Sequence, residues 1–457
     1  MTATIRWSMT SIASSRGGDA AAAALDRFGQ GGCADIILRC RVLRSIDRDL
    51  ALRMIGGMTQ AIEQAFDRLG PDLVMTFTID RYVMDVMERI ARRRGIDFLE
   101  MTTSIIPDQV MLMRRGKPVW LREPSREDID AAVGQLCRED FAPAYVRDAK
   151  RFSLARFWRI FGYYALRGAF FNVLRFLKRD RYNCHYLDAL KRLKHKVRMR
   201  DASVLGLLDH GWDKRLAEVP RERRVFLGLQ LFPEASMDYW LESQDLLAHD
   251  DVVVRYCEAL GRAGYRIFVK DHPLQFGFRQ RELFERLAKL PFVVLVPYDV
   301  PANLLIGKCA VSVTFTGTIG FQAALAGLCS IATEPYYATE QHFLHVRDTN
   351  EVDGVVERLA QWQSPRRSRH DPPRDHAAPG VDQRRGGLLR LAQVRSRERG
   401  LACLGRAAGA FPERASAAVP EVLQNRRLTI RWDAPLKPMS TAGGNGKARC
   451  DLVSLTS

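Results

Sequence analysis

Three short polar motifs, each placed directly after an apolar run, constrain this chain more than any other feature. They occupy residues 230–236, 269–273 and 314–320. The runs before them are nearly continuous in Val, Ile, Leu and Phe, a composition typical of parallel strands that helices cover on both faces. Because parallel strands end at one edge of an open α/β sheet, and ligands bind at that edge, the three motifs are expected to form a single site.

Strands and helices alternate along most of the chain. Strand-like runs at residues 72–78 and 96–101 flank a helical stretch at 81–94, and this order is the building unit of a parallel sheet. Further strands are expected at residues 225–231, 265–270, 292–296, 310–315 and 329–333, with helices between most of them. The alternation predicts an α/β fold with two Rossmann-like domains.

Changes in composition divide the chain into five parts. Residues 47–148 are expected to form the first Rossmann-like domain and residues 223–363 the second, with a basic amphipathic helical connector at 149–222 between them. Residues 1–46 have poor periodicity and are expected to be an irregular segment. Residues 364–457 are rich in Arg, Ala, Gly and Pro, and this composition predicts a disordered tail.

The net charge of +17 comes largely from the predicted tail. Between residues 365 and 457 there are 16 Arg and 2 Lys against 8 Asp or Glu, which gives +10. The rest of the chain is only mildly basic, so the charge does not indicate specific nucleic-acid binding. The nine cysteines are scattered without a Cys-x-x-Cys pair, and no secretory leader or membrane-spanning run is expected, which together favour a cytoplasmic location.

Basic and aromatic residues are interleaved in the connector between residues 150 and 181. A helix of this composition is able to lie in an anionic membrane interface, and a peripheral contact with the inner membrane is one interpretation of it. The alternative is a helix that packs its aromatic stripe on the protein and exposes its Arg side chains to water.

The motif at residues 316–320 has the chemistry of a phosphate-binding turn. Gly317 and Gly320 allow close approach of the backbone, while Thr316 and Thr318 carry hydroxyl groups at the start of a helix. The motif is not Gly-x-Gly-x-x-Gly, and it lacks the Lys of a P-loop. An ordinary strand–helix turn with a Thr cap explains the same residues.

The other two motifs add charged groups at neighbouring strand ends. Lys270 and His272 are able to donate hydrogen bonds to phosphate oxygens, and His272 is also able to carry a proton near neutral pH. Glu234 is a candidate base or an acceptor for a sugar hydroxyl. A surface Lys-Asp pair, a turn histidine and a structural carboxylate are the alternatives for these residues.

Together the three motifs resemble the capsule polysaccharide biosynthesis family. The resemblance lies in residues 229–236, the Val-Lys-Asp-His-Pro block at 269–273 and the Thr-Gly-Thr-Ile-Gly-Phe-Gln-Ala run at 316–323, and it extends over residues 48–360. Some members of the wider family are bacterial β-Kdo transferases. The resemblance implies a two-domain GT-B glycosyltransferase that moves a sugar from a nucleotide-sugar donor to a growing capsular or surface polysaccharide, or to a lipid-linked glycan.

The resemblance also implies roles for single residues, with the donor phosphates held at the second and third motifs. The catalytic candidates are His272, Glu234 and Asp80, of which Asp80, at a strand end in the first domain, would be the base. The substrate-binding candidates are Gln230, Ser236, Lys270, Thr316, Gly317, Thr318, Gly320 and Gln322. No metal and no cofactor are expected besides the nucleotide-sugar donor, for which a CMP-linked sugar is one form.

Gln322 is the main departure from the family pattern, which has a Glu at this position. Gln322 keeps a hydrogen-bond acceptor but carries no charge. Asp271 replaces a Glu before the His-Pro pair, and Leu-Cys replaces Lys-Pro after Gly327. These departures, and the changed composition at both ends, leave open a catalytically impaired sugar-nucleotide-binding or assembly component. A nucleotide-sugar epimerase is a weaker alternative, since such enzymes share the GT-B fold.

Overall fold

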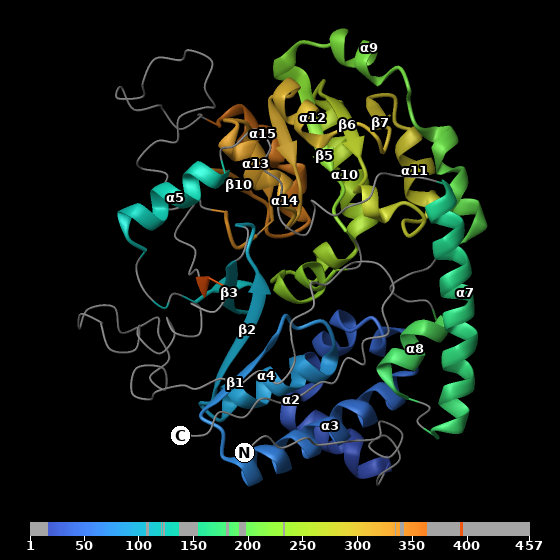
Figure 1. Cartoon of the computed structure of the whole chain (residues 1–457), viewed down its shortest axis with the longest axis vertical. Coiled ribbons are helices and arrows are strands. Elements are labelled where there is room, and N and C mark those ends of the chain that lie inside the picture. The colour runs from blue at the N-terminus through green and yellow to red at the C-terminus, as the bar shows by residue number, and fades with distance from the viewer. Residues whose placement is uncertain are drawn as a thin grey trace.

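The structure, a computed structural model, describes residues 17–106, 109–119, 121, 124–136, 154–179, 182–191, 198–231, 234–333, 335–338, 342–362 and 394–395. Figure 1 shows two α/β units. The first is built on the sheet that contains strands β1 to β4, and the second, which lies above it in this view, is built on the sheet of strands β5 to β10. Helix α7 (Leu154–Leu177) runs along one side of both units. The tail predicted at residues 364–457 lies outside the described residues, apart from the short strand β11 (Val394–Arg395).

The second unit is built on a parallel sheet of six strands. Their order is β10-β9-β8-β5-β6-β7, and every neighbouring pair is parallel. Counted along the chain from one to six, the order is 6-5-4-1-2-3, the doubly wound Rossmann order. The expected Rossmann-like sheet is therefore confirmed in this unit. The strands are β5 (Arg224–Gly228), β6 (Arg266–Lys270), β7 (Val293–Val296), β8 (Val311–Val313), β9 (Cys329–Ala332) and β10 (Phe343–His345).

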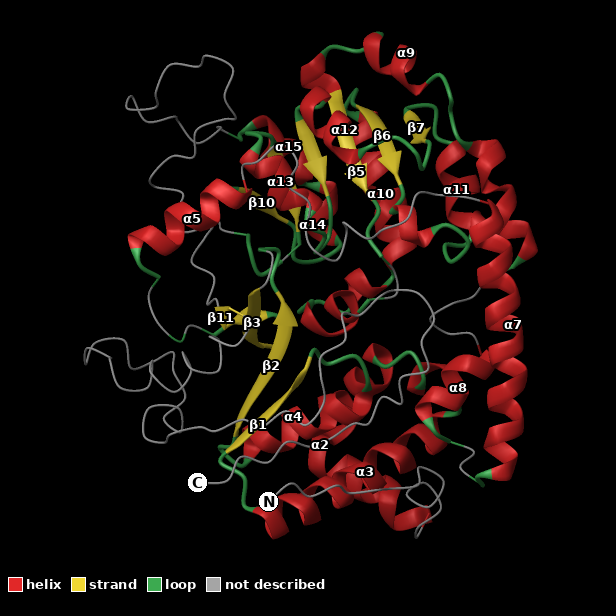
Figure 2. Cartoon of the chain, viewed as in Figure 1, coloured by secondary structure: helices red, strands yellow, loops and turns green. Residues whose placement is uncertain are grey.

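Apolar residues lie on both faces of this sheet, which explains the nearly continuous apolar runs. Successive side chains of a strand point to opposite faces. In β5, Val225 and Leu227 pack with helices α10 and α11, while Phe226 packs with α12 on the other face. Figure 2 shows the helices around these strands. They are α9 (Trp212–Ala217), α10 (His249–Arg262), α11 (Arg281–Ala288), α12 (Ala302–Lys308), α13 (Ile319–Leu325), α14 (Asn350–Asp353) and α15 (Val355–Ala360).

The first unit contains a smaller, mixed sheet. Strands β1 and β2 are parallel and are linked by α4, as the sequence predicted, and β3 then pairs antiparallel with β2. Strands β4 and β11 add further antiparallel pairs to β3. The two sheets confirm the α/β class, with one Rossmann-type crossover in the first unit. Its elements are β1 (Leu73–Phe77), α4 (Tyr82–Arg93), β2 (Asp97–Thr103), β3 (Gln109–Arg114) and β4 (Lys117–Pro118). Helix α5 (Arg126–Leu136) packs in a cluster with residues of both units, among them Met111 of β3 and Phe321 of α13.

The N-terminal segment expected to be irregular is helical over much of its length. Helix α2 (Gly17–Arg39) packs against α3 (Arg48–Leu69) and buries Ala24 and Ile36 there. Ala and Gly dominate the sequence of α2, so its apolar residues show little helical periodicity. Gly29, with a φ of 69°, also interrupts the helix, and for both reasons the sequence pattern does not predict it. The expectation of an irregular segment is wrong for residues 17–39.

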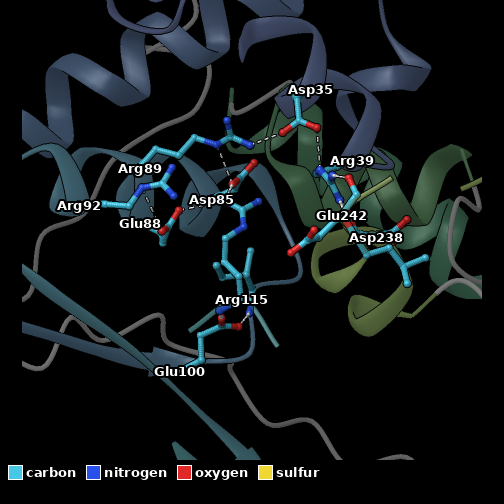
Figure 3. A network of polar contacts seen from close by, with 12 residues as sticks. Asp35, Arg39, Asp85, Glu88, Arg89, Arg92, Glu100, Arg115, Asp238 and Glu242 are labelled. Carbon is cyan, nitrogen blue, oxygen red and sulfur yellow. Dashed lines mark hydrogen bonds and ion pairs between the residues drawn. The ribbon is translucent and has the colours of Figure 1, made fainter. Parts of the chain in front are cut away.

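Arginines of the first unit contact the second unit. Arg39, at the end of α2, is buried and lies beside Asp238 of the π-helical turn η4 (Ser236–Trp240) (Figure 3). It donates to the carbonyl of Asp238 at 3.0 Å and to that of Leu241, which directly follows η4, at 2.8 Å. Arg41 pairs with the Asp238 carboxylate at 2.7 Å. The Asp238 carboxylate is buried, and removing the partner of a buried charge costs about 3–5 kcal/mol, so these contacts hold the units together.

The same network continues inside the first unit. Asp35 of α2 pairs with Arg39 at 2.7 Å and with Arg89 of α4. Arg115, in the turn after β3, pairs with Asp85 of α4 at 2.7 Å, as Figure 3 shows. Ion pairs therefore connect the sheet, α4 and α2 of the first unit to the contact with the second.

Helix α7 contacts both units. Near its start Phe157 is fully buried, and its ring centroid lies 5.5 Å from that of Phe276, in the loop after β6. Near its end Phe171 lies 5.4 Å from Tyr186 of α8 (Cys184–Lys191), a helix that packs in the core of the first unit. None of the helices among the described residues is long and apolar enough to cross a membrane.

A glycine substitution tests the packing of α2 on α3. A Cβ at Gly56 would collide with the backbone carbonyl of Ala20. We predict that Gly56→Ala lowers the free energy of unfolding by about 1–3 kcal/mol, because the two helices have to separate. Gly134→Ala on α5, a position with open space around it, is the matched control and is expected to be neutral or stabilising by up to about 1 kcal/mol. Urea denaturation measures both, and equal stability of the two variants would contradict this packing.

Candidate functional site

Gln230 and Thr316 form the centre of the candidate site. Gln230 follows β5 and Thr316 follows β8, the neighbouring strands at which the strand order reverses. Ligands bind at such a switch point in open α/β sheets. The Gln230 amide oxygen accepts from the Thr316 backbone N–H at 2.8 Å, and Gln230 Nε2 donates to Thr316 Oγ1 at 3.0 Å. The Thr316 hydroxyl donates to Ser236 Oγ at 2.9 Å, so three of the predicted residues meet here.

Gly317 and Gly320 are required by the close packing of the turn. A Cβ on Gly317 would lie 2.8 Å from Thr314 Oγ1, and one on Gly320 would lie 2.8 Å from Tyr337 Oη. The Tyr337 hydroxyl also donates to the Gly317 carbonyl. The backbone of residues 317–320 therefore lies directly against these side chains, and the turn leaves no room for larger residues.

A buried carboxylate organises the end of β6. Asp271 is buried and accepts three hydrogen bonds of 2.8 Å, from the His272 backbone N–H, Arg279 Nε and the Tyr298 hydroxyl. Arg279 also donates to the Gln230 carbonyl, which ties the end of β6 to the end of β5. Asp271 is thus engaged inside the protein, and its contacts fix the backbone of His272 at the end of β6.

Lys270 is a buried cation at the same strand end. It is 4% exposed, and its Nζ donates to the carbonyls of Asp271 (3.2 Å) and Tyr298 (3.4 Å). Burial lowers the pKa of Lys270 to about 8, while the negative charges of Asp271 and Asp299 act in the opposite direction. The ammonium group is charged at neutral pH in surroundings that disfavour the charge, so a bound anion would stabilise it.

His272 is neutral at neutral pH and carries its proton on Nε2. Burial lowers the pKa of His272 to about 4, and the positive charges of Lys270, Arg279 and Arg156 act in the same direction. Nδ1 accepts a hydrogen bond from the Leu274 backbone N–H at 3.2 Å. A neutral imidazole that accepts at Nδ1 has its proton on Nε2. His272 is therefore suited to donating a hydrogen bond and not to releasing a proton near neutral pH.

The other predicted residues lie on nearby elements or in the first unit. Thr318 stands at the N-cap position of α13 without a side-chain cap bond, and Gln322 lies half-buried one turn later. Glu234 lies just before η4, and its carbonyl accepts from the backbone N–H of Met237 at 3.1 Å. Asp80 follows β1 in the first unit and pairs with its neighbour Arg81 at 3.8 Å. Their parts in binding or catalysis stay predictions.

Sequence reasoning missed three residues of this region, which are Arg279, Tyr298 and Arg156. Arg279 and Tyr298 bind the Asp271 carboxylate from 8 and 27 residues farther along the chain, in stretches without a recognised motif. Arg156 comes from α7 and acts on His272 by its charge. An Arg inside the otherwise aromatic loop at residues 276–279 was the one sequence signal for Arg279.

Comparison with known proteins finds matches among solved structures. No protein-family model matches the chain, and neither does any curated protein. One matching structure is the β-Kdo 2,7 transferase KpsC of Thermosulfurimonas dismutans, which is 12% identical, with 64% of this chain and 74% of that chain covered and a TM-score of 0.30. A β-Kdo 2,4 transferase structure of KpsC from the same organism is 16% identical, with coverages of 61% and 74% and a TM-score of 0.30.

A nucleotide-sugar enzyme of a second class also matches. It is the UDP-GlcNAc 2-epimerase of Methanocaldococcus jannaschii, 12% identical, with 68% of this chain and 75% of that chain covered and a TM-score of 0.27. The matches thus include β-Kdo transferases, the class that the sequence motifs resemble.

The hydrogen bonds between Gln230 and Thr316, which we call the Gln230–Thr316 bridge, are predicted to stabilise the fold. Gln230→Leu would leave the buried Thr316 backbone N–H without its acceptor, which is expected to lower the free energy of unfolding by about 1–3 kcal/mol. Gln322→Leu, at a half-buried helical position, is the matched control and is expected to change stability by less than about 0.5 kcal/mol. Urea denaturation distinguishes them, and a Gln230→Leu protein as stable as the control would contradict the bridge.

Proposed function

We propose that this protein is a glycosyltransferase that transfers a sugar from a nucleotide-sugar donor to a capsular or surface polysaccharide acceptor. The observation that carries the proposal lies at the switch point of a Rossmann-ordered sheet, where Gln230 after β5 bonds to Thr316 after β8. Lys270 and His272 stand at the end of the neighbouring strand β6, and Arg279 ties that end to Gln230. A buried ammonium group and a fixed N–H donor beside a tight Gly-containing turn suit the diphosphate or phosphate of a sugar nucleotide.

The chemistry proposed for these groups is stabilisation of the leaving group. As the bond between the sugar and the donor phosphate breaks, negative charge grows on the phosphate oxygens. Lys270 would stabilise that charge by its ammonium group, and His272 by its Nε2–H. Because the pKa of His272 is held at about 4, the histidine acts as a neutral donor of a hydrogen bond and not as an acid. Asp80 of the first unit is proposed as the base that accepts the proton of the acceptor hydroxyl.

Glu234 and Gln322 are proposed to take part in substrate binding, and the reaction is proposed to occur at the inner membrane. Glu234 and Gln322 would contact the sugar or the ribose, and a metal ion would not be required, since Lys270 supplies the positive charge. The reaction would take place in the cytoplasm against the inner membrane, where lipid-linked acceptors are held.

Gln322 favours a second candidate, a sugar-nucleotide-binding or assembly component with impaired catalysis. The family pattern that the chain resembles has a carboxylate where Gln322 stands on α13. If donor binding survives in this protein while transfer and donor hydrolysis are both absent, this second function replaces the first. Interconversion of a free UDP-sugar with its 2-epimer would instead support the epimerase.

Substitution of His272 tests donor binding directly. Removing a hydrogen bond to a charged oxygen costs about 1.5–3 kcal/mol, so His272→Ala is expected to weaken binding of UDP or CMP by about 10- to 150-fold. His272→Gln, whose amide keeps an N–H donor at a similar reach, is expected to recover part of the loss. Thermal shift and calorimetric titration of the full chain measure both. Unchanged affinity in His272→Ala would place the phosphate elsewhere, and no binding of any nucleotide by the unsubstituted protein would remove the transferase and the epimerase together.

The pH dependence of nucleotide binding has a predicted sign. An anion binds the charged form of Lys270, so affinity is lost as pH rises through the pKa of about 8 in the free protein, by at most about tenfold per pH unit. His272 stays neutral throughout this range because its pKa is about 4. Calorimetry with UDP between pH 7 and pH 10 is expected to show this fall, and Lys270→Gln is expected to bind weakly at every pH without it. The same fall in Lys270→Gln would mean that another group is responsible.

A further inference from the structure

The outer side of α7 carries most of the exposed apolar surface that the described residues show. Twelve large hydrophobic side chains are exposed in this part of the chain, and eight of them belong to α7. Single exposed apolar residues are ordinary, whereas a gathered set marks a contact surface. The eight are Leu154, Trp158, Tyr163, Leu166, Phe170, Val173, Phe176 and Leu177.

These side chains form a continuous stripe along the helix. Residues 163, 166, 170, 173 and 177 recur at alternating intervals of three and four, which places them on one face. Leu166 is 74% exposed and Leu177 is 75% exposed. Phe157 points the other way and is buried against Phe276, so the opposite side of α7 is the one that packs on the protein. We call the exposed stripe, with Trp158 and Phe176 beside it, the outer face of α7.

Positive charges stand at both ends of the outer face. Arg159 lies seven residues before Leu166, in line with the stripe, and Lys178 and Arg179 follow its last residue; all three are exposed. Helix α7 contains four Arg and neither Asp nor Glu. Apolar side chains between cations match the boundary of an anionic bilayer, where the apolar groups enter the acyl region and the cations meet phosphate groups.

We propose that the outer face of α7 binds the surface of an anionic phospholipid membrane. A second copy of the chain is disfavoured as the occupant, because two α7 helices would bring together like charges without any acidic partner. Residues 365–457 are disfavoured as well, because their net charge is +10. Anionic phospholipid headgroups supply the net negative charge that neither a second α7 nor residues 365–457 carry.

The position of α7 links this surface to the donor site. Its first turns carry Arg156, whose charge acts on His272, and Phe157, which packs on the loop after β6. A membrane bound along α7 would therefore also lie beside these first turns, which pack on the loop that follows His272. The inference thereby deepens the proposed function, and it rests on that function only for the acceptor being lipid-linked.

Vesicle binding of the full chain tests the inference. We expect the protein to sediment with vesicles of phosphatidylglycerol and phosphatidylcholine in equal parts, to sediment at least tenfold less with pure phosphatidylcholine, and to be released by high salt. Leu166→Glu/Phe170→Glu is expected to reduce binding to the anionic vesicles at least tenfold. Leu304→Glu, at a 46% exposed position on α12, is the matched control and is expected to bind as the unsubstituted protein does.

Trp158 gives a second measurement that does not depend on a charged substitution. Its fluorescence, taken as the difference between the unsubstituted protein and Trp158→Phe, is expected to shift to shorter wavelength on addition of anionic vesicles. Sedimentation that the α7 double substitution leaves unchanged, or a Trp158 signal that vesicles do not alter, would overturn the proposal. So would a dimer in solution that Leu166→Glu/Phe170→Glu dissociates, because the occupant would then be a second copy. Nucleotide affinity is expected to be equal in all of these variants, so failure of the lipid inference is distinguishable from failure of the proposed function.

Discussion

The guanidinium group of Arg39 is the contact on which the relation between the two units depends. It donates to the carbonyls of Asp238, Leu241 and Glu242, at and after the π-helical turn η4. Such carbonyls need a donor when they are buried, and Arg39 supplies several N–H groups from one rigid side chain. The segment that receives Arg39 begins at Gln230, which bridges to Thr316 at the switch point. One stretch of chain therefore carries both the contact between the units and the centre of the candidate site.

In the candidate site the negative charge of Asp271 is bonded inside the protein, while the ammonium group of Lys270 donates to backbone carbonyls, and this arrangement suits an anionic ligand. The Asp271 carboxylate is used by Arg279, Tyr298 and the backbone of His272, so it holds the loop in place. Lys270 is bonded to backbone carbonyls, and burial lowers its pKa. A protein that buries a lysine in this manner gives up stability that an anion restores on binding. The same surroundings keep His272 neutral, so that one strand end presents a cation and a neutral donor together.

Helix α7 packs beside the candidate site on one side and is exposed to solvent on the other. Its inner side contributes Phe157 to the core of the second unit, and its far end packs on α8 at the first unit. Its outer side presents apolar and basic residues. Because α7 packs on both units and carries a distinct exposed face, a partner bound to that face would lie alongside both units.

The sequence by itself indicated the parallel sheet and the common edge of its motifs. Apolar runs such as residues 225–229 are typical of strands that helices cover on both faces, and the ends of parallel strands lie at one edge of the sheet. That Gln230 contacts Thr316 follows from the pairing of β5 with β8, which only the structure shows. The tertiary structure alone decided the rest. Helix α2 was hidden because Ala and Gly give little amphipathic period, and its place depends on the fit of Gly56 against Ala20. The partners of Asp271, the contacts of Arg39 and the charge of Arg156 near His272 join residues far apart in the chain, and local sequence patterns carry no record of such pairings.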